Sequence, residues 1–194
     1  MDADNTRRRF LLGSALGLSS VWLAMRWPAI VAAQQHAQRS GESGQPPSFQ
    51  FFSPQDALEI EAVAAQIIPS DDAPGARQAR VIYFIDRALM TFDVEKQLAY
   101  TQGLEDLQQK TLELFPGTDR FSSLSSVQQV QLLTAIEQTG FFELVRLHTI
   151  MGYLSHPDYG GNQGKAGWKL IGFEDKMTYA PPFGYYDTEY NKRR

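Results

Sequence analysis

The sequence has no cysteine among its 194 residues. This absence excludes disulfide bonds, thiolate metal sites, iron–sulfur clusters and C-x-x-C-H haem attachment within this chain. Only three histidines occur, and no H-x-x-x-H or E-x-x-H pair is present, so the signature of a ferritin-like carboxylate site is lacking. G-x-S-x-G, G-x-G-x-x-G and P-loop elements are also lacking. The sequence therefore offers no motif that would build an active site unaided.

Positive charge is scarce outside the N-terminus. The chain carries 18 Lys and Arg against 22 Asp and Glu, for a net charge of −4. Residues 1–33 hold four arginines and two aspartates, so the remainder is more acidic than the whole. An acidic body argues against nucleic-acid binding, which needs a basic surface. Hydrophobic residues make up 43% and aromatic residues 12%, which is enough for the core of one domain with extensions.

The first residues are arranged as an export signal. A basic cluster precedes an apolar stretch that is softened by glycine and serine, which is the layout of a secretion signal. Residues 6–11 are similar to the twin-arginine export consensus, with the matching positions Arg7, Arg8, Phe10 and Leu11. The alternative is a membrane anchor, but Arg26 and Pro28 interrupt the run before about 18–20 apolar residues accumulate. We therefore predict a signal segment over residues 1–33, either cleaved or retained.

The rest of the chain divides into three parts. Residues 34–48 are polar and contain Gly and Pro without periodic apolar positions, which predicts a flexible leader. Residues 49–154 show apolar positions at helical spacing and no long alternation at period two, which predicts an all-α domain of about five helices. Residues 155–194 are rich in Gly, Pro and Tyr. Such a long segment without regular pattern is either disordered or packed against something, and its aromatic residues favour packing.

Capping residues predict where the helices begin, and apolar positions at helical spacing predict which face of each helix is buried. Ser53 is followed by Pro54 and Asp56, and Ser125 is followed by Gln128 three residues later; both are typical helix starts. Further helices are expected over residues 76–92, 94–114 and 141–153. The positions expected to face the core include Ile60, Val63, Ile67, Val81, Ile85, Leu98, Leu104, Leu107, Val127, Val130, Leu133, Ile136, Leu144, Val145 and His148.

Several short constellations have a structural and a chemical interpretation. His148, His156 and Asp158 are conceivable metal ligands, but hydrogen bonding within a packed surface and capping of the loop are the simpler roles. The adjacent Asp71 and Asp72 lie between two helices beside Pro and Gly, where turn and capping roles are usual. The glycines at 160 and 161 favour positive φ angles or close backbone approach, because no strand precedes them to form a phosphate cradle.

The tail after residue 176 contains Tyr179, Phe183, Tyr185, Tyr186 and Tyr190 among prolines. It either folds back over the chain's own helices or forms an interface arm. Tyr-rich irregular segments provide a large contact area at low entropic cost, which favours the arm.

Two separated stretches carry a family resemblance. The first is "EAVAAQIIPSDDAPGA" at residues 61–76, followed by "VIYFID" at residues 81–86. The second contains His148 and Gly152-Tyr153, then "PDYGGN" at residues 157–162, Gly167-Trp168 and "IGF" at residues 171–173. In this order the two stretches resemble the gluconate 2-dehydrogenase subunit 3 family. With the N-terminal signal the resemblance covers nearly the whole chain, and it is weaker between residues 92 and 122.

The resemblance implies a small subunit, without a cofactor of its own, in a periplasmic dehydrogenase complex. The large partner is expected to be an FAD-dependent flavoprotein of the glucose–methanol–choline (GMC) oxidoreductase type, which oxidises sugars, sugar acids or alcohols. A c-type cytochrome that carries haem c is an expected third subunit. Because the flavoprotein of such complexes commonly lacks an export signal, the small subunit is expected to carry it through the twin-arginine translocase and to assist its maturation. Any membrane association would come through the complex.

On this interpretation the Gly-rich loop lies on the partner subunit, with Tyr159 and Trp168 as anchors. The residues expected at the partner interface are His148, Tyr153, Pro157, Tyr159, Gly160, Gly161, Asn162, Trp168, Phe173, Tyr185 and Tyr186. No catalytic, cofactor-binding or metal-binding residue is expected. Two alternatives remain open: an exported helical binding module without a redox partner, and an independent metalloenzyme that uses His148, His156 and Asp158.

Overall fold

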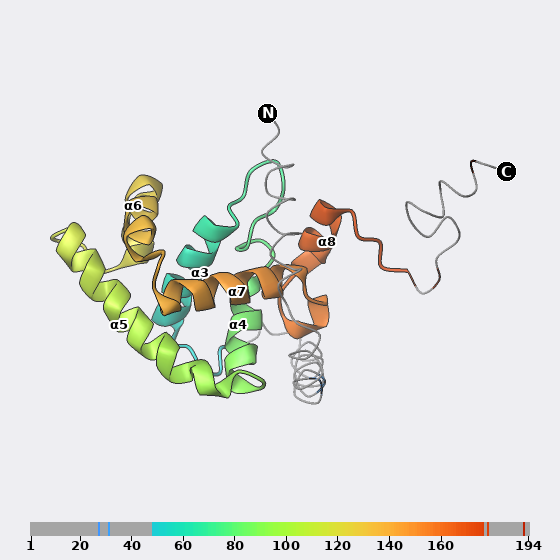
Figure 1. Cartoon of the computed structure of the whole chain (residues 1–194), viewed down its shortest axis with the longest axis horizontal. Helices are drawn as coiled ribbons and strands as arrows, with labels where there is room; N and C mark the ends of the chain where they lie inside the picture. Colours follow the sequence, from blue (N-terminus) through green and yellow to red (C-terminus); the bar gives the residue numbers. More distant parts are fainter. Residues whose placement is uncertain (1–26, 28–30, 32–47, 177, 179–191, 193–194) are drawn as a thin grey trace.

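The described part of the chain contains helices and no strand, which confirms the all-α prediction. The computed structural model describes residues 27, 31, 48–176, 178 and 192. Its elements, labelled in Figure 1 where there is room, are α3 (Pro54–Ile67), α4 (Val81–Met90), η1 (Val94–Lys96), α5 (Gln97–Leu114), η2 (Phe121–Ser123), α6 (Ser126–Ile136), α7 (Gly140–Leu154), η3 (Pro157–Tyr159), η4 (Gln163–Lys165) and α8 (Ala166–Ile171).

The predicted helix starts are confirmed by their caps. The Ser53 hydroxyl accepts a hydrogen bond from the Asp56 backbone N–H at 3.1 Å, with Pro54 at the first helical position. Ser125 and Gln128 form a complete capping box at the start of α6. Each bond satisfies a backbone donor that the first turn of a helix leaves without a partner. α3 ends at Ile67, two residues before the proline at position 69, which cannot continue a helix.

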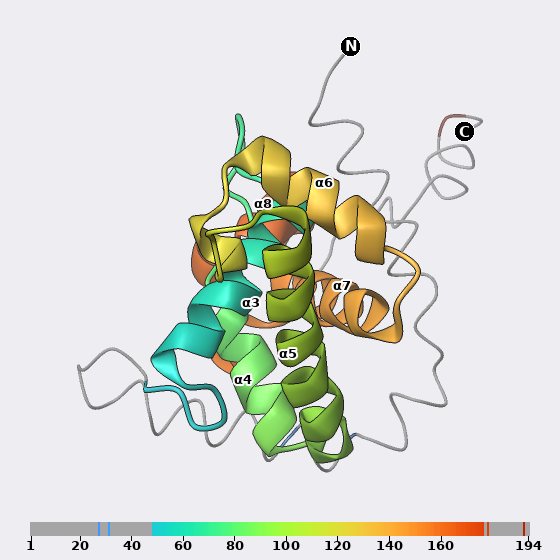
Figure 2. The same cartoon turned by 90° about the vertical axis from the view of Figure 1, so that its left-hand side faces the viewer.

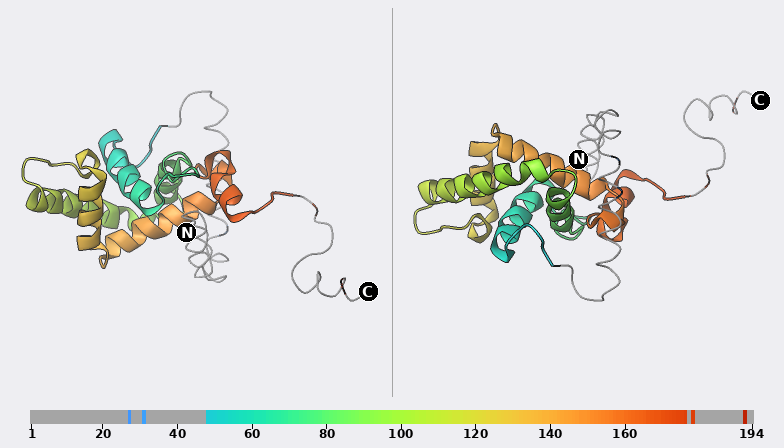
Figure 3. Two further views of the ribbon diagram at one scale, coloured as in Figure 1. Left: turned by 90° about the horizontal axis from the view of Figure 1, so that it is seen from above. Right: turned by 90° about the horizontal axis from the view of Figure 1, so that it is seen from below.

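Helix α7 lies at the centre and packs against α3 and α4 (Figures 1 and 3). Figure 2 shows α6 lying across the end of α5, and α5 in turn contacts α7. The single core cluster is formed mainly by α3, α4 and α7 with contributions from α5, α6 and α8; its fully buried large side chains include Ile60, Val63, Ile68, Ile85, Leu89, Tyr100, Leu107, Phe121, Leu132 and Tyr153.

The predicted core face of α6 is wrong at Val127 and Val130, whereas Leu133 is buried as predicted and Ile136 packs against the core. Val127 is 79% exposed and Val130 is exposed as well, whereas Leu132 and Gln129 are buried with Leu133. The buried Gln129 amide accepts a hydrogen bond from Gln66 Nε2 at 2.6 Å and donates one to the Phe121 carbonyl at 3.1 Å. Apolar residues occur on two faces of this short helix, so spacing alone does not decide which face meets α3.

The segment after residue 154 is more regular than expected. It forms η3, η4 and the six-residue helix α8, where a wholly irregular segment was predicted. Left-handed residues separate these short pieces, at Gly160 (φ 106°), Asn162 (φ 50°) and Lys165 (φ 59°), and Gly172 (φ 73°) ends α8. Within the described residues, no helix has the length and apolar character needed to cross a membrane.

Candidate partner interface

The two stretches that carry the family resemblance lie against each other in the fold. The Tyr153 hydroxyl, on α7, donates a hydrogen bond to the Pro74 carbonyl at 2.5 Å. The Gln163 backbone N–H donates to the Ala79 carbonyl at 3.0 Å. We call the contact between residues 69–87 and residues 152–173, together with the packing of the loop of residues 155–173 on the end of α7, the seam. It brings together segments more than 60 residues apart in the sequence.

Glycines allow the backbones at the seam to touch. A Cβ atom on Gly161 would lie 2.2 Å from the Gly152 carbonyl oxygen, and one on Gly167 would lie 1.9 Å from the Tyr153 carbonyl oxygen. Gly152 in turn faces Phe84 of α4, whose ring carbon would lie 2.9 Å from an added Cβ. The Gly-rich loop therefore lies directly on α7. The backbone that these glycines approach belongs to the same chain, and a contact of the loop with another subunit stays a prediction.

Two side chains fix the loop to the end of α7. The buried Asn162 donates from Nδ2 to the Ser155 carbonyl and accepts from the Gly167 N–H, both at 2.8 Å. The Trp168 indole N–H donates to the Leu154 carbonyl at 2.8 Å. Trp168 is thus an anchor within the chain and is buried; its role as an anchor on a partner stays a prediction.

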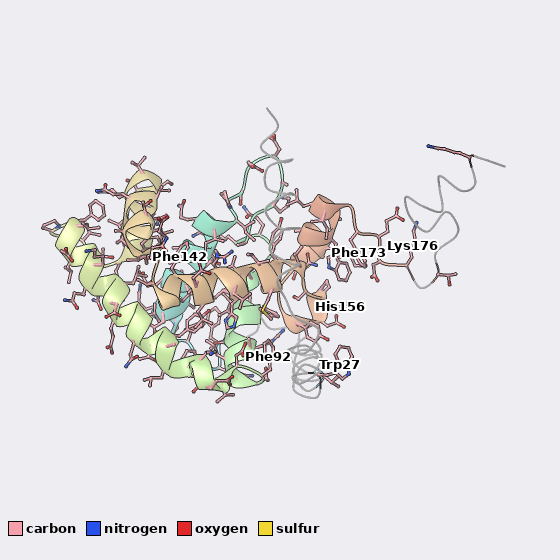
Figure 4. All side chains as sticks on the ribbon, viewed as in Figure 1. Trp27, Phe92, Phe142, His156, Phe173 and Lys176 are labelled. Atoms are coloured by element: carbon pink, nitrogen blue, oxygen red, sulfur yellow. The ribbon has the colours of Figure 1, made fainter. Side chains whose placement is uncertain are left out.

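Aromatic side chains form a ledge on the outer side of this loop. The Trp168 ring lies 5.5 Å from His156 and 5.1 Å from Phe173, and His156 lies 6.3 Å from Tyr159. We call these four residues the aromatic ledge. Phe173 is 48% exposed, and the His156 side chain is 44% exposed. Figure 4 labels Phe173 and His156 at the same end of the molecule, beside α8. Exposed aromatic rings next to buried ones are typical of an interface.

Polar contacts hold the opposite side of the seam. The Asp86 carboxylate, 2% exposed, accepts hydrogen bonds from the backbone N–H groups of Gln50, Phe51 and Phe52 at 2.8, 3.0 and 3.0 Å. Charge-assisted bonds of this kind are the strong ones. The last residue of "VIYFID" therefore fixes the chain entering α3 against α4.

His148 lies in a buried polar chain. Its Nδ1 lies 2.9 Å from the Tyr100 hydroxyl and its Nε2 lies 3.0 Å from Asp93 Oδ2, and all three residues are buried. Burial, followed by the nearby Asp93 charge, raises the pKa of Tyr100 well above its usual value. The chain joins α5, α7 and the turn after α4. Because His148 is 1% exposed, it acts inside this subunit rather than on its surface.

The residues considered for acid–base or metal chemistry have structural roles in the fold. Asp71 Oδ1 accepts from the Ala73 N–H at 3.0 Å, which is a turn. His156 Nδ1 accepts from the Asp158 N–H at 3.3 Å, which confirms the capping role. In the part of the chain that the structure describes, no group of three or more His, Asp or Glu residues is placed to hold a metal ion. The metalloenzyme alternative therefore finds no site there.

A pocket of about 310 Å³ lies away from the seam, between the start of α3, α5 and the loop before η2. Its lining includes Phe51, Phe52, Asp56, Glu59 and Arg120. The Glu59 carboxylate is occupied, since it accepts from the Ser122 hydroxyl at 2.5 Å and from the Ser122 N–H at 3.3 Å.

A comparison with known protein families matches residues 54–175 to the family described as gluconate 2-dehydrogenase subunit 3. The chain belongs to this family. The match spans both sides of the seam and ends at Asp175, directly after the aromatic ledge. A comparison with curated proteins finds no match, and neither does a comparison with solved structures.

The structure sorts the predicted interface residues of this family member into three groups. Five of them are buried within the subunit: His148, Tyr153, Gly161, Asn162 and Trp168. Pro157, Tyr159 and Gly160 are half-buried and Phe173 is exposed, so among the predicted residues that the structure describes these four are the accessible ones. Tyr185 and Tyr186, like Arg7, Arg8, Phe10 and Leu11 of the export signal, lie outside the described residues.

Sequence reasoning missed Asp86, Asp93, Tyr100 and Arg87. The sequence does mark Asp86, because two adjacent charged residues at positions 86 and 87 interrupt an otherwise apolar helix. No comparable signal marks Asp93 and Tyr100, whose partner His148 is about 50 residues away.

Proposed function

We propose that this chain is the small, non-catalytic subunit of a periplasmic FAD-dependent sugar or sugar-acid dehydrogenase complex. It carries a flavoprotein of the GMC type through the twin-arginine translocase and stabilises it. The FAD belongs to the flavoprotein, and haem c belongs to a c-type cytochrome as third subunit. The observation that carries this proposal is the family match over residues 54–175, whose description names a gluconate 2-dehydrogenase subunit.

The arrangement of polar side chains supports a structural rather than a chemical role. Buried carboxylates that resemble catalytic groups already bind within the chain: Glu59 with Ser122, Asp86 with backbone N–H groups, and Asp93 with His148. These bonds hold the elements of the fold together. A carboxylate that is already hydrogen-bonded within the protein is poorly placed to accept or give a substrate proton. What the chain presents outward is the aromatic ledge, a surface suited to protein contact.

Isolation of the chain from its native host tests the association. A C-terminally tagged copy is purified from the periplasm, and the product is examined on a gel and by visible spectroscopy. We expect a stoichiometric partner of flavoprotein size together with flavin absorbance. A colourless, single-component product would contradict the proposal and favour the binding-module alternative.

The export part has its own test. In the double variant Arg7→Lys with Arg8→Lys, both this chain and the flavoprotein should accumulate in the cytoplasm, because the twin-arginine pair is the export address. Arg9→Lys is the matched control and should leave both proteins in the periplasm. A flavoprotein that still reaches the periplasm with the double variant would show that it travels independently.

A further inference from the structure

Arg87 of α4 is placed at the surface of the seam under the Gly-rich loop. A Cβ atom on Gly160 would lie 2.5 Å from Arg87 Nη1 and 3.2 Å from the Tyr83 backbone carbonyl carbon. Gly160 also has φ 106°, which only glycine adopts at little cost. The loop therefore crosses directly over the guanidinium and covers part of it, and any side chain at position 160 would displace it.

Among the residues that the structure describes, the Arg87 guanidinium lacks the carboxylate contact that three other arginines have. Arg77, Arg120 and Arg146 lie 3.1, 3.9 and 2.7 Å from the carboxylates of Glu61, Asp119 and Glu143. Within the described residues, no hydrogen bond or ion pair reaches the Arg87 side chain. A half-buried guanidinium carries five N–H donors, and burying donors without acceptors is unfavourable.

Asp86, adjacent to Arg87 in sequence, and Asp158, in the loop that contains Gly160, bind other groups. Asp86 precedes Arg87 in the chain and favours its charge, but the Asp86 oxygens accept from the backbone of residues 50–52. Asp158 of the overlying loop lies 3.4 Å from His156. Burial lowers the pKa of Arg87 from its ordinary value, more than Asp86 raises it, which is consistent with a cation that is only partly compensated.

The surroundings of Arg87 have the composition of a protein interface. Tyr83 and Arg87 lie at i and i+4, so they share one face of α4, and Arg80 directly precedes the helix as its N-cap residue. The Phe49 ring stacks on Tyr83, with centroids 5.0 Å apart and an interplanar angle of 14°. Arg80 is exposed and likewise has no ion pair among the described residues. We call Phe49, Arg80, Tyr83 and Arg87 the arginine face.

We propose that the arginine face receives an acidic segment of the flavoprotein subunit, one carboxylate of which pairs with Arg87. The proposal rests on the proposed function for the identity of the partner. For the chemistry it rests on charge complementarity, because within the described residues neither Arg87 of α4 nor Arg80 directly before α4 has a carboxylate partner. A planar guanidinium binds a carboxylate through two parallel N–H donors. Arginine beside aromatic rings is the composition that dominates binding at protein interfaces.

The first experiment measures the dissociation constant of the complex reconstituted from full chain and flavoprotein. Arg87→Gln should weaken binding on the order of 10–100-fold, as expected when one member of a buried charge pair is removed. Arg146→Gln on α7 is the matched control, because that arginine already has Glu143 as its partner, and it should bind as the unchanged chain does. Unfolding temperatures of both variants establish that they are folded.

The second experiment locates the partner carboxylate directly. In the Arg87→Lys variant, a zero-length carbodiimide reagent should join the new amine to an aspartate or glutamate of the flavoprotein by an amide bond, found by peptide mass spectrometry. Arg146→Lys should give no such link. This readout remains available if Arg87→Gln proves unstable, because the lysine keeps the charge.

The outcomes separate this inference from the proposed function. If the unchanged chain binds the flavoprotein and Arg87→Gln binds it equally well, with no cross-link at position 87, the inference is overturned while the proposed function stands. If the unchanged chain binds no flavoprotein, the proposed function is overturned and this inference with it.

Discussion

The seam and the outer helices α5 and α6 are stabilised by different kinds of contact. At the seam, backbone groups touch through glycines such as Gly161, and buried side chains bind backbone groups: Asn162 binds Ser155 within the loop, and Asp86 binds Phe52, 34 residues away. On α5 and α6, apolar side chains remain in water: Leu98 is 67% exposed and Val127 is 79% exposed. The seam thus depends on particular residue types at particular positions. On α5 and α6 such positions are fewer, with Tyr100 and its bond to His148 as the main example.

This difference explains where the family resemblance is carried. The resembling stretches are the two sides of the seam, and the stretch where the resemblance weakens, residues 92–122, corresponds largely to η1, α5 and the following loop. Specific contacts restrict sequence more than a helix that buries one stripe of side chains.

Gly161→Ala should be the most damaging. The added Cβ would lie 2.2 Å from the Gly152 carbonyl oxygen, a backbone atom that cannot rotate away, so we expect a loss of about 3 kcal/mol in the free energy of unfolding. Gly140→Ala is the control, since nothing lies within 4 Å of its added Cβ. Urea unfolding measures both. Equal stability of the two variants would show that the seam is not closely packed.

Asp86→Asn should come next. The amide keeps one acceptor oxygen but presents an NH₂ group to a backbone N–H, so one of the three charge-assisted bonds is lost and the others weaken. We expect about 2 kcal/mol of destabilisation, together with faster proteolytic cleavage near residues 48–52. Asp106→Asn on the exposed side of α5 is the control. Unchanged protection of the segment would contradict the role given to Asp86.

Tyr100→Phe tests the link between the centre of the fold and α5. Removing the hydroxyl leaves His148 Nδ1 without its 2.9 Å partner, and we expect a loss of about 1–2 kcal/mol in the free energy of unfolding. Tyr83→Phe is the control, because no hydrogen bond to the Tyr83 hydroxyl is formed by the described residues.

The same variant makes a prediction about alkaline pH. Burial raises the pKa of Tyr100, so the unfolded chain ionises this hydroxyl at about pH 10 while the folded chain keeps its proton. The stability that depends on Tyr100 is therefore fully present below pH 10 and falls as the pH rises above it. Tyr100→Phe should lose less stability between pH 9 and pH 11 than the unchanged chain. Parallel pH profiles would contradict this explanation.

Val127→Gln should have the smallest effect. This side chain is 79% exposed, so its replacement should change the free energy of unfolding by less than about 0.5 kcal/mol. A Leu132→Ala variant on the buried face of the same helix should cost several times more, about 2–5 kcal/mol. A large loss at Val127 would show that α6 packs on the face that spacing alone predicted.

The sequence was sufficient for features that depend on local chemistry. The Ser53 and Ser125 caps, the end of α3 before Pro69, the left-handed conformations at Gly160 and Asn162 and the capping role of His156 are all decided within a few residues of chain. Local hydrogen bonds and steric limits on φ act at that range, and residue type alone reports them.

Features that depend on contacts between residues far apart in the sequence could not be predicted from residue type. In a sequence, a glycine that permits close approach to α7 cannot be distinguished from one that permits close approach to another subunit. The sequence therefore does not reveal that the loop packs on Gly152 and Tyr153 of its own chain. Helix α8 was missed because six residues among glycines make too short a pattern to detect. The pairing of His148 with Asp93 and Tyr100 needs the fold itself.

Native mass measurement of the complex purified through a tag on this chain tests the central claim most directly. The account predicts a principal species in which one copy of this chain is bound to a flavoprotein, with the added mass of FAD released on denaturation. A principal species with the mass of this chain alone, full-length or processed, would contradict the assignment as a dehydrogenase subunit.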